Sequence, residues 1–500
     1  MNLKEMMREK IAKDVLRQSS EDEWHVFVYN KSTARILTHI FTKTQILSNE
    51  ILSMQRLELN RDPIAYPAIY FVTYCKETYR AIKKDVKNKI YTKYYIIHTN
   101  EIKENEKIIG DNIFYKHVDI NFVVMDERVF TCLDSVEDAM RSFSSILKLR
   151  FNMVNLRADT ALFEQLRTND SMCESRSEYY NSDLIILDRS FDMIVPLIHF
   201  FNFESLLYDL NLCQSTTDES PLYREIRYLH IADTNSVLNN KAQKLVEGMK
   251  KIDQKTDINE IHKLVLEAPE NIKLKESVNR YINLAEDTLN LFEKEQLNYI
   301  ATFEQNISTG YDNKGSRYQN GIKDVFSVLN QKIKRENKLR LVLLLLSTHY
   351  DFQANEVSKL KDKLMLTDQE LKIFEKLKVM RKNFNKRKEY NSKFTYEISR
   401  YDPLLHDLLR AFVQNKNNRF SNLVKRETTE KKESLRKSSF VFMRHETKKK
   451  TLVLYIDVLT YPEMMLINQM SEKSSYEVFV CTNQVVTPKE YLKWLEETRV

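Results

Sequence analysis

The chain has 500 residues, with 78 lysines and arginines against 71 acidic residues and a net charge of +7. This length predicts two to four domains with ample core. A charge so close to balance argues against a dedicated nucleic-acid binder, in which basic residues dominate one domain. No apolar run reaches membrane-spanning length, and the amino-terminal sequence lacks a signal-peptide core, so we expect a cytoplasmic protein.

Glycine and cysteine usage excludes several kinds of site. The chain holds only five glycines, and none forms a G-x-G, a G-x-x-x-x-G-K-[ST] or a G-x-S-x-G pattern. Phosphate-binding loops and the hydrolase nucleophile turn need glycine for close backbone approach, so we expect neither. The five cysteines are scattered without a C-x-x-C, and no H-E-x-x-H occurs. We therefore expect reduced thiols, no metal site and no cofactor.

Strands and helices alternate in the first third of the chain. Residues 24–30, 68–74 and 94–100 are rich in aromatic and β-branched side chains and predict strands, while 33–41 and 76–87 predict helices between them. Such alternation is typical of a parallel sheet with helices on both faces.

A second group of strands begins at residues 120–130. It is followed by a predicted helix at 134–150, with Asp134 as its N-cap. From about residue 213 to residue 437 the strand pattern gives way to charged, periodic helices. Thr367 and Glu370 have the spacing of a capping box in this helical part.

Strand patterns return near the carboxyl end, at 451–457 and 476–483, and Pro462 and Pro488 each suit the first turn of a helix. We expect these terminal strands to pair with the sheet that contains residues 184–187. The predicted fold class is α/β plus all-α, with two parallel-sheet domains and a large helical insertion. The predicted domains are residues 1–127, residues 128–212 together with 438–500, and residues 213–437.

The most informative segment is DLIILDRSFDMIVPLIHFFNFESLLYDL, residues 183–210. It predicts a buried strand, a charged turn with Asp188, Arg189 and Asp192, a break at Pro196 and then a helix. Charged residues at the carboxyl end of such a strand often mark a ligand site. We interpret them as structural, because Arg189 has an acid on either side and charge-assisted hydrogen bonds would hold the turn.

The D-R-S-F-D block, with proline, histidine and Y-D-L behind it, resembles the signature of the SM proteins. This is the Sec-one/Munc-eighteen family, which handles SNARE proteins in membrane fusion. Further stretches resemble the family in the same order along the chain; they are residues 8–37, 61–72, 282–310, 396–409 and 482–495. The amino-terminal segments are most similar to the exocytic branch.

The resemblance implies an arch of three domains around a cleft that grips the helical bundle of a syntaxin-like (Qa) SNARE. It implies a non-enzymatic chaperone and template, which aligns a second SNARE, of the R type, for assembly. It also implies a monomer that reaches membranes of the secretory pathway through its partners.

The resemblance assigns SNARE contacts on the first domain to Arg35, Lys43, Gln55, Arg61 and Asp62. Lys43 stands next to the position that matches a family lysine, and Gln55 replaces a family acid. The alternative is that each is an ordinary surface side chain, worth at most about 1 kcal/mol.

A second set of SNARE contacts is assigned to a helical hairpin near residues 302–329. Ile322, Val325 and Leu329 form one apolar face there, and periodicity alone does not separate a partner-binding face from a core face. Three of the five glycines lie between the two arms, which predicts a flexible turn and a movable hairpin. Asn320-Gly321 stands where the family commonly has a proline.

Two other segments carry predictions of their own. Residues 101–117 are short and polar where the family has a longer helix beside an outer pocket for a syntaxin amino-terminal peptide, so we expect that pocket not to be intact. The basic stretches 378–393 and 425–450 predict solvated segments, or alternatively a surface that touches acidic lipid headgroups.

The alternative from another functional class is a metal-dependent nucleotide-sugar transferase built on the twin α/β domains. In that interpretation Asp183, Asp188 and Asp192 hold the metal ion. No phosphate-binding loop accompanies these carboxylates.

Overall fold

The computed structural model describes residues 2–18, 23–156, 180–213, 220–250, 258–348, 350–381, 394–414 and 450–498. The predictions for Cys173, for residues 382–393 and for residues 425–449 lie outside these ranges. The chain divides into two compact units. Unit 1 is Met1–Asp188, Ala411–Asp457 and Ile467–Gln484, and unit 2 is Arg189–Arg410, Val458–Leu466 and Val485–Val500.

The first sheet of unit 1 has five strands in the order β2-β1-β3-β4-β5, all parallel. The strands are β1 (His25–Tyr29), β2 (Ile51–Arg56), β3 (Ala68–Val72), β4 (Tyr94–His98) and β5 (Ile113–His117). The predicted strands β1, β3 and β4 are confirmed. The sequence did not predict β2 and β5, because both lie at the edges of the sheet and expose about half of their side chains, so they lack an apolar run.

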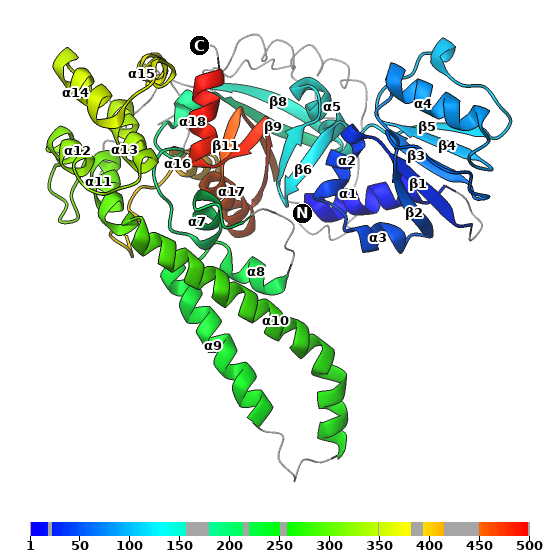
Figure 1. The fold of residues 1–500 in the computed structure, drawn as a ribbon, viewed down its shortest axis with the longest axis horizontal. Helices are drawn as coiled ribbons and strands as arrows, with labels where there is room; N and C mark the ends of the chain where they lie inside the picture. The colour runs from blue at the N-terminus through cyan, green and yellow to red at the C-terminus, as the bar shows by residue number, and fades with distance from the viewer. Residues whose placement is uncertain are drawn as a thin grey trace, which may run out of the picture. The chain divides into compact units, whose positions relative to one another are not determined.

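Helices cover both faces of the first sheet (Figure 1). Val26 and Val28 point to one face, where they share a core with Ile82 of α4. Phe27 and Phe71 point to the other face and share a core with α1, α2 and α3. This alternation is the period of two that a strand imposes. The helices are α1 (Leu3–Ile11), which continues as the π-helix η1 (Ala12–Leu16), α2 (Lys31–Thr38), α3 (Lys43–Leu47) and α4 (Lys76–Lys87).

The second sheet of unit 1 has six strands in the order β6-β7-β12-β10-β9-β8. They are β6 (Phe122–Asp126), β7 (Val129–Cys132), β8 (Leu149–Leu156), β9 (Tyr180–Leu187), β10 (Lys450–Ile456) and β12 (Tyr476–Thr482). Only β6 is antiparallel to its neighbour. The parallel pairing of β10 with β9 confirms that strands from the carboxyl end complete the sheet of the signature segment.

Two details of this sheet differ from the sequence-based expectations. The strand β6 belongs to the second sheet, although the predicted domain boundary after residue 127 places it in the first domain. The helix α5 (Val136–Leu147) is capped by Ser135, whose hydroxyl accepts from the N–H of Asp138, and not by Asp134. Serine at this position satisfies an otherwise unpaired amide of the first turn. The three-domain division remains a prediction.

Unit 2 is mainly helical. Its helical elements are η4 (Arg189–Phe191), α7 (Phe203–Asp209), α8 (Pro221–Ile226), α9 (Ile231–Lys250), α10 (Ile258–Lys294), α11 (Leu297–Thr309), α12 (Gly321–Leu329), α13 (Arg335–Ser347), α14 (Ala354–Leu364), α15 (Asp368–Met380) and α18 (Pro488–Glu497), with α16 (Leu404–Val413) and α17 (Tyr461–Lys473) at its borders with unit 1. A small sheet pairs β11 (Val458–Thr460) with β13 (Gln484–Val486), and the 3-10 helix η2 (Glu104–Glu106) lies in unit 1. The capping box of Thr367 and Glu370 is confirmed at the start of α15.

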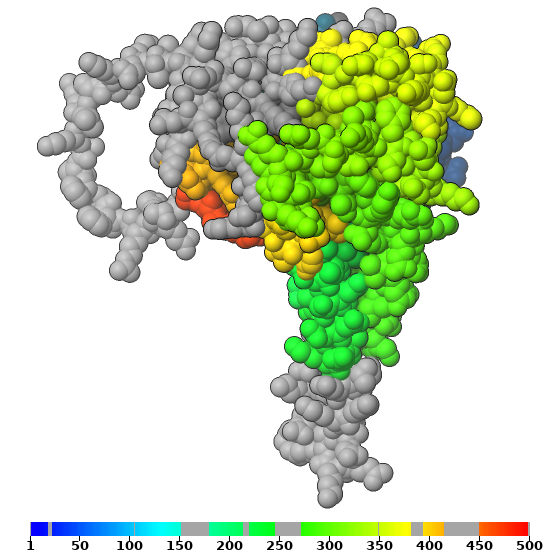
Figure 2. Space-filling view, turned by 90° about the vertical axis from the view of Figure 1, so that its left-hand side faces the viewer, coloured from blue at the N-terminus to red at the C-terminus, as the bar shows by residue number. Residues whose placement is uncertain are grey.

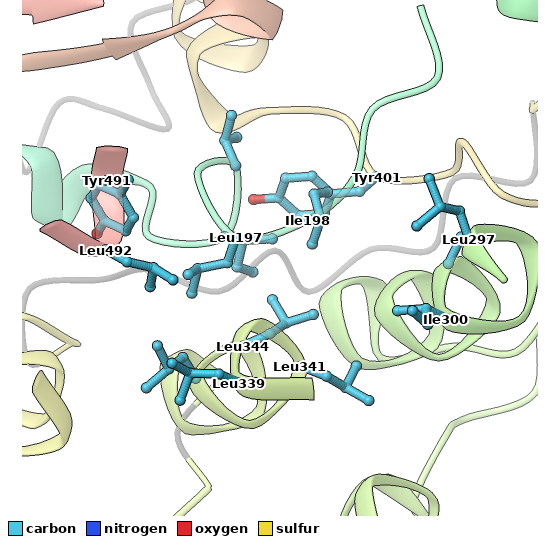
Figure 3. Close-up of a cluster of buried hydrophobic side chains, with 14 of the residues drawn as sticks. Leu197, Ile198, Leu297, Ile300, Leu339, Leu341, Leu344, Tyr401, Tyr491 and Leu492 are labelled. Atoms are coloured by element: carbon cyan, nitrogen blue, oxygen red, sulfur yellow. The ribbon is translucent and has the colours of Figure 1, made fainter. Parts of the chain in front are cut away.

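The core of unit 2 gathers segments that are far apart in the sequence (Figure 3). The signature loop contributes Leu197 and Ile198, and α13 contributes the whole leucine run 341–346, all buried as predicted. Tyr401 reaches into the same cluster. The labelled partners are Leu297 and Ile300 of α11, Leu339, Leu341 and Leu344 of α13, and Tyr491 and Leu492 of α18.

The longest pair of helices in the described chain is α9 with α10, which run side by side (Figures 1 and 2). The hairpin predicted near 302–329 is a different pair of helices, because it consists of α11, a loop and α12. In that loop Asp312 accepts hydrogen bonds from the N–H groups of Lys314 and Ser316, and Tyr311 pairs with Arg317. These contacts hold the loop in a defined turn, and its flexibility remains a prediction.

Candidate functional site

The carboxyl end of the first sheet is closed by its own side chains. The strand order places a topological switch point between β1 and β3, which is where sheets of this type bind ligands. Asn30, buried at the end of β1, accepts from the Thr33 amide (3.1 Å) and donates to the carbonyl of Thr73 (2.9 Å) at the end of β3. The asparagine thus bridges the ends of the two strands at the position where a ligand would bind.

Arg189 of the signature is fully buried and forms a two-pronged ion pair with Glu463 at 2.8 and 2.9 Å. The same guanidinium donates to the carbonyls of Val458 and Asp192. Burial lowers the pKa of Arg189, but Glu463 outweighs this effect and raises that pKa, so the guanidinium stays charged. The main counter-charge of Arg189 is Glu463 of α17, 274 residues away, and the flanking Asp192 adds to it.

Asp192 anchors a second segment of the chain. Its carboxylate accepts from the Tyr401 hydroxyl at 3.0 Å, from the Leu404 amide at 2.9 Å and from the Ile194 amide at 3.0 Å. The side chain is fully buried. Asp192 therefore holds the start of α16 against the signature loop. A structural role was expected for this residue, and the start of α16 is the segment that it holds.

A metal site at the predicted carboxylates does not fit this arrangement. The oxygens of Asp192 are already occupied by hydrogen-bond donors. Within the described residues no group of three or more histidine, cysteine, aspartate or glutamate side chains is arranged to hold a metal ion. Asp183 lies within strand β9, and Asp188 follows the end of that strand.

The histidine and the Y-D-L of the signature belong to another buried ion cluster. Asp209 receives two hydrogen bonds from Arg340 of α13, at 2.8 and 3.1 Å. Arg340 also donates to the carbonyl of Leu197 and contacts Nε2 of His199. His199 donates from Nδ1 to Glu304 at 2.8 Å when Arg340 donates to its Nε2. The signature loop is thereby tied to α11 and α13.

The F-E-Q stretch completes the network, since the amide oxygen of Gln305 accepts from the backbone N–H groups of Arg400 and Tyr401. The signature segment and the stretches around residues 304–305 and 400–404 therefore meet at one buried polar network in unit 2. Sequence reasoning missed Glu304, Arg340 and Glu463 as its members. The sequence signal that could have identified Arg340 is a charged residue inside an apolar run, as in KLRLVLLLL at residues 338–346.

The predicted SNARE contacts on the first domain differ in exposure. Arg35, Lys43 and Asp62 are exposed, and Arg35 donates one hydrogen bond to the carbonyl of Leu133. Their charges are accessible to a partner.

The side chains of the other two predicted contacts are engaged within the first domain. Arg61 is 5% exposed, pairs with Asp85 at 2.6 Å and donates to three backbone carbonyls. Gln55 accepts from the Tyr91 hydroxyl. Burial and the neighbouring Asp85 carboxylate raise the pKa of Tyr70, which donates to that carboxylate. The geometry gives Arg61 a structural role in holding α4, and its contact with a SNARE remains a prediction.

The predicted contacts on α12 lie largely in the core. Val325 is fully buried, Leu329 is buried, and Ile322 packs partly against the same cluster. This placement favours the core-packing alternative for Val325 and Leu329.

Two mainly parallel α/β sheets in unit 1 and a mainly helical unit 2 match the architecture that the resemblance to the SM proteins implies. A model of the Sec1 family matches residues 25–494, and the chain therefore belongs to the Sec1 family. The "Protein transport protein sec1" of Schizosaccharomyces pombe is 21% identical, over 99% of this chain and 85% of that relative. The protein of the same name from Dictyostelium discoideum is 21% identical, over 99% of this chain and 98% of the relative.

Solved structures confirm the predicted fold class. The Unc18–syntaxin 1 complex from Monosiga brevicollis matches with a TM-score of 0.83 at 16% identity, over 99% of both chains. The SM protein Vps45 in complex with the Qa SNARE Tlg2 matches with a TM-score of 0.80 at 16% identity, over 99% of this chain and 98% of that one. No helix of the described chain combines the length and the hydropathy needed to cross a bilayer.

Proposed function

We propose that the chain binds a syntaxin-like Qa-SNARE and promotes its assembly with further SNAREs during vesicle docking and fusion. The observation that carries the proposal is the fold match, over 99% of both chains, to a protein in complex with syntaxin 1. The relatives named for protein transport point to the same process. Their Sec1 names favour the exocytic step.

The exposed charges of the first domain are suited to such a partner. A SNARE motif is a long amphipathic helix with apolar a and d positions and charged flanks. Arg35, Lys43 and Asp62 offer both signs of charge on one domain. Complementary charges of this kind set the register and the association rate more than they set the affinity.

We further propose that the chain is not an enzyme and acts by positioning its partners. Holding two SNARE helices in register removes most of the entropic cost of bringing them together. The hydrogen bonds of Asn30 at the switch point of the first sheet and the fully engaged carboxylate of Asp192 support this view. We also propose that the chain is recruited peripherally to secretory membranes.

Titration of the purified chain with each syntaxin-like SNARE of its source organism tests the proposal, with calorimetry as the readout. We expect binding to at least one of them, alone or in an assembled bundle. The charge-reversed variant Arg35→Glu with Lys43→Glu should bind at least tenfold more weakly, because truncating one partner of a desolvated charge pair costs about 2–5 kcal/mol.

The matched control reverses Lys359 and Lys361, two exposed lysines of α14, and should bind as the unmodified chain does. Arg61 is unsuitable for this test, because its ion pair with Asp85 is buried. Absence of binding to every syntaxin-like SNARE would defeat the proposal.

A further inference from the structure

The outer face of α4 carries a stripe of positive charge that the proposed SNARE contacts do not use. Its exposed basic residues are Lys76, Arg80, Lys83, Lys84 and Lys87, with Lys89 just beyond the helix. The spacing of the five helical positions places them on one side of an α-helix. Glu77 is the single acid exposed on the helix, because the other acid, Asp85, is buried against Arg61.

Glu77 is close enough to interact electrostatically with Lys76 and Arg80, whereas the other four cations have no such neighbour among the acids of α4. In the part of the chain that the structure describes, none of the six forms an ion pair; Lys83 contacts the Tyr79 hydroxyl and Lys84 contacts the side-chain oxygen of Asn60. The buried side of α4 packs on the first sheet through Ile82, and the opposite face of that sheet is covered by α1, α2 and α3 (Figure 1). The stripe therefore points away from the body of unit 1.

An exposed apolar side chain lies beside the stripe. Leu59 is 62% exposed and directly precedes Asn60, which contacts Lys84. Leu57, two residues earlier, packs in the same core as Ile82, so this turn emerges on the α4 side of the sheet. The acids of this turn are Glu58, which accepts from the Lys31 amide, and Asp62.

We propose that the outer face of α4 binds anionic phospholipid headgroups and brings the first domain into direct contact with a membrane. Clustered lysines are attracted to an anionic bilayer surface, by about 1 kcal/mol for each side chain near it. Five of the six cations are lysines, which act as point charges suited to a diffuse surface, whereas docking of an acidic peptide favours the paired donors of arginine. Leu59 is placed to enter the interface between headgroups and acyl chains.

Co-sedimentation of the full chain with vesicles, in the absence of any SNARE, tests this proposal independently of the proposed function. We expect binding to vesicles of phosphatidylcholine mixed with phosphatidylserine, weak binding to phosphatidylcholine alone, and a loss of binding as salt is added. The variant Lys83→Gln, Lys84→Gln, Lys87→Gln should bind about a hundredfold more weakly, at about fivefold for each lysine. Leu59→Ser should weaken binding several-fold.

The matched control is Lys359→Gln, Lys361→Gln, Lys372→Gln, which removes the same net charge from exposed positions on α14 and α15. It should bind as the unmodified chain does, and thermal melting should show that both triple variants are folded. Equal binding to neutral and anionic vesicles would overturn the proposal, as would equal losses in the two triple variants. Binding of a polyglutamate peptide without binding of anionic vesicles would also overturn it, in favour of a protein-docking surface.

Discussion

Single residues of the signature act through partners that are distant in the sequence. Arg189 pairs with Glu463, Asp192 with Tyr401, and Asp209 with Arg340. The sequence favoured a structural role for Arg189 and Asp192, because no phosphate loop or ligand spacing accompanies them, and their buried contacts are consistent with that role. It did not reveal the partners, since residues at such separations show no shared spacing or period.

The first prediction concerns the buried Arg189–Glu463 pair. Replacing Glu463 by glutamine should lower the free energy of unfolding by about 3–5 kcal/mol, because a guanidinium is then buried without a counter-charge. Denaturant unfolding followed by circular dichroism measures this effect. The double variant Arg189→Met, Glu463→Met removes both charges and should recover much of the loss. A single variant as stable as the unmodified chain would contradict the assigned role.

At the scale of elements, the sequence predicted the buried strands and the capped helices well. The central strands β1, β3, β4 and β9 carry apolar runs, which their burial requires. The edge strands β2 and β5 were not predicted. An edge strand pairs with one neighbour only and stays partly exposed, so its residues need not follow an apolar pattern. The glycine content of the α11–α12 loop did not reveal the hydrogen bonds that Asp312 accepts from Lys314 and Ser316.

The second prediction concerns the start of α15 and its pH dependence. Burial raises the pKa of Glu370, but hydrogen bonds from Arg335 and Thr367 outweigh it, so the pKa lies below its ordinary value of 4.5. Since the pKa of the folded state is lowered, the stabilisation is present above about pH 4.5 and is lost as the pH falls further.

The variant Glu370→Gln should therefore be about 1 kcal/mol less stable at neutral pH, because glutamine can keep the capping geometry but loses the ion pair with Arg335. The difference between the two proteins should shrink as the pH is lowered below that value. Thermal melting at several pH values measures it. A difference that stays constant across the acid range would show that the charge of Glu370 contributes nothing.

At the scale of the whole molecule, the signature segment and the later stretches that carry the family resemblance supply the buried polar contacts of unit 2. The signature loop, α11, α13, the start of α16 and the start of α17 meet in one buried network. This explains why collinear motifs identified the fold class although identity to each named relative is only 21%. Partner contacts are harder to predict, because a sequence does not distinguish an arginine whose side chain is exposed, such as Arg35, from one whose side chain is held in a buried ion pair, such as Arg61.

The most direct test of the central claim is the rate at which SNAREs assemble in the presence of the chain. A syntaxin-like SNARE and its partner SNAREs carry fluorophores that transfer energy only in the assembled bundle. We predict that an equimolar amount of the purified chain raises the assembly rate, and that reversing the charges of Arg35 and Lys43 abolishes the gain while reversing those of Lys359 and Lys361 does not. An assembly rate unchanged by the chain with every syntaxin-like SNARE of its source organism would contradict the account.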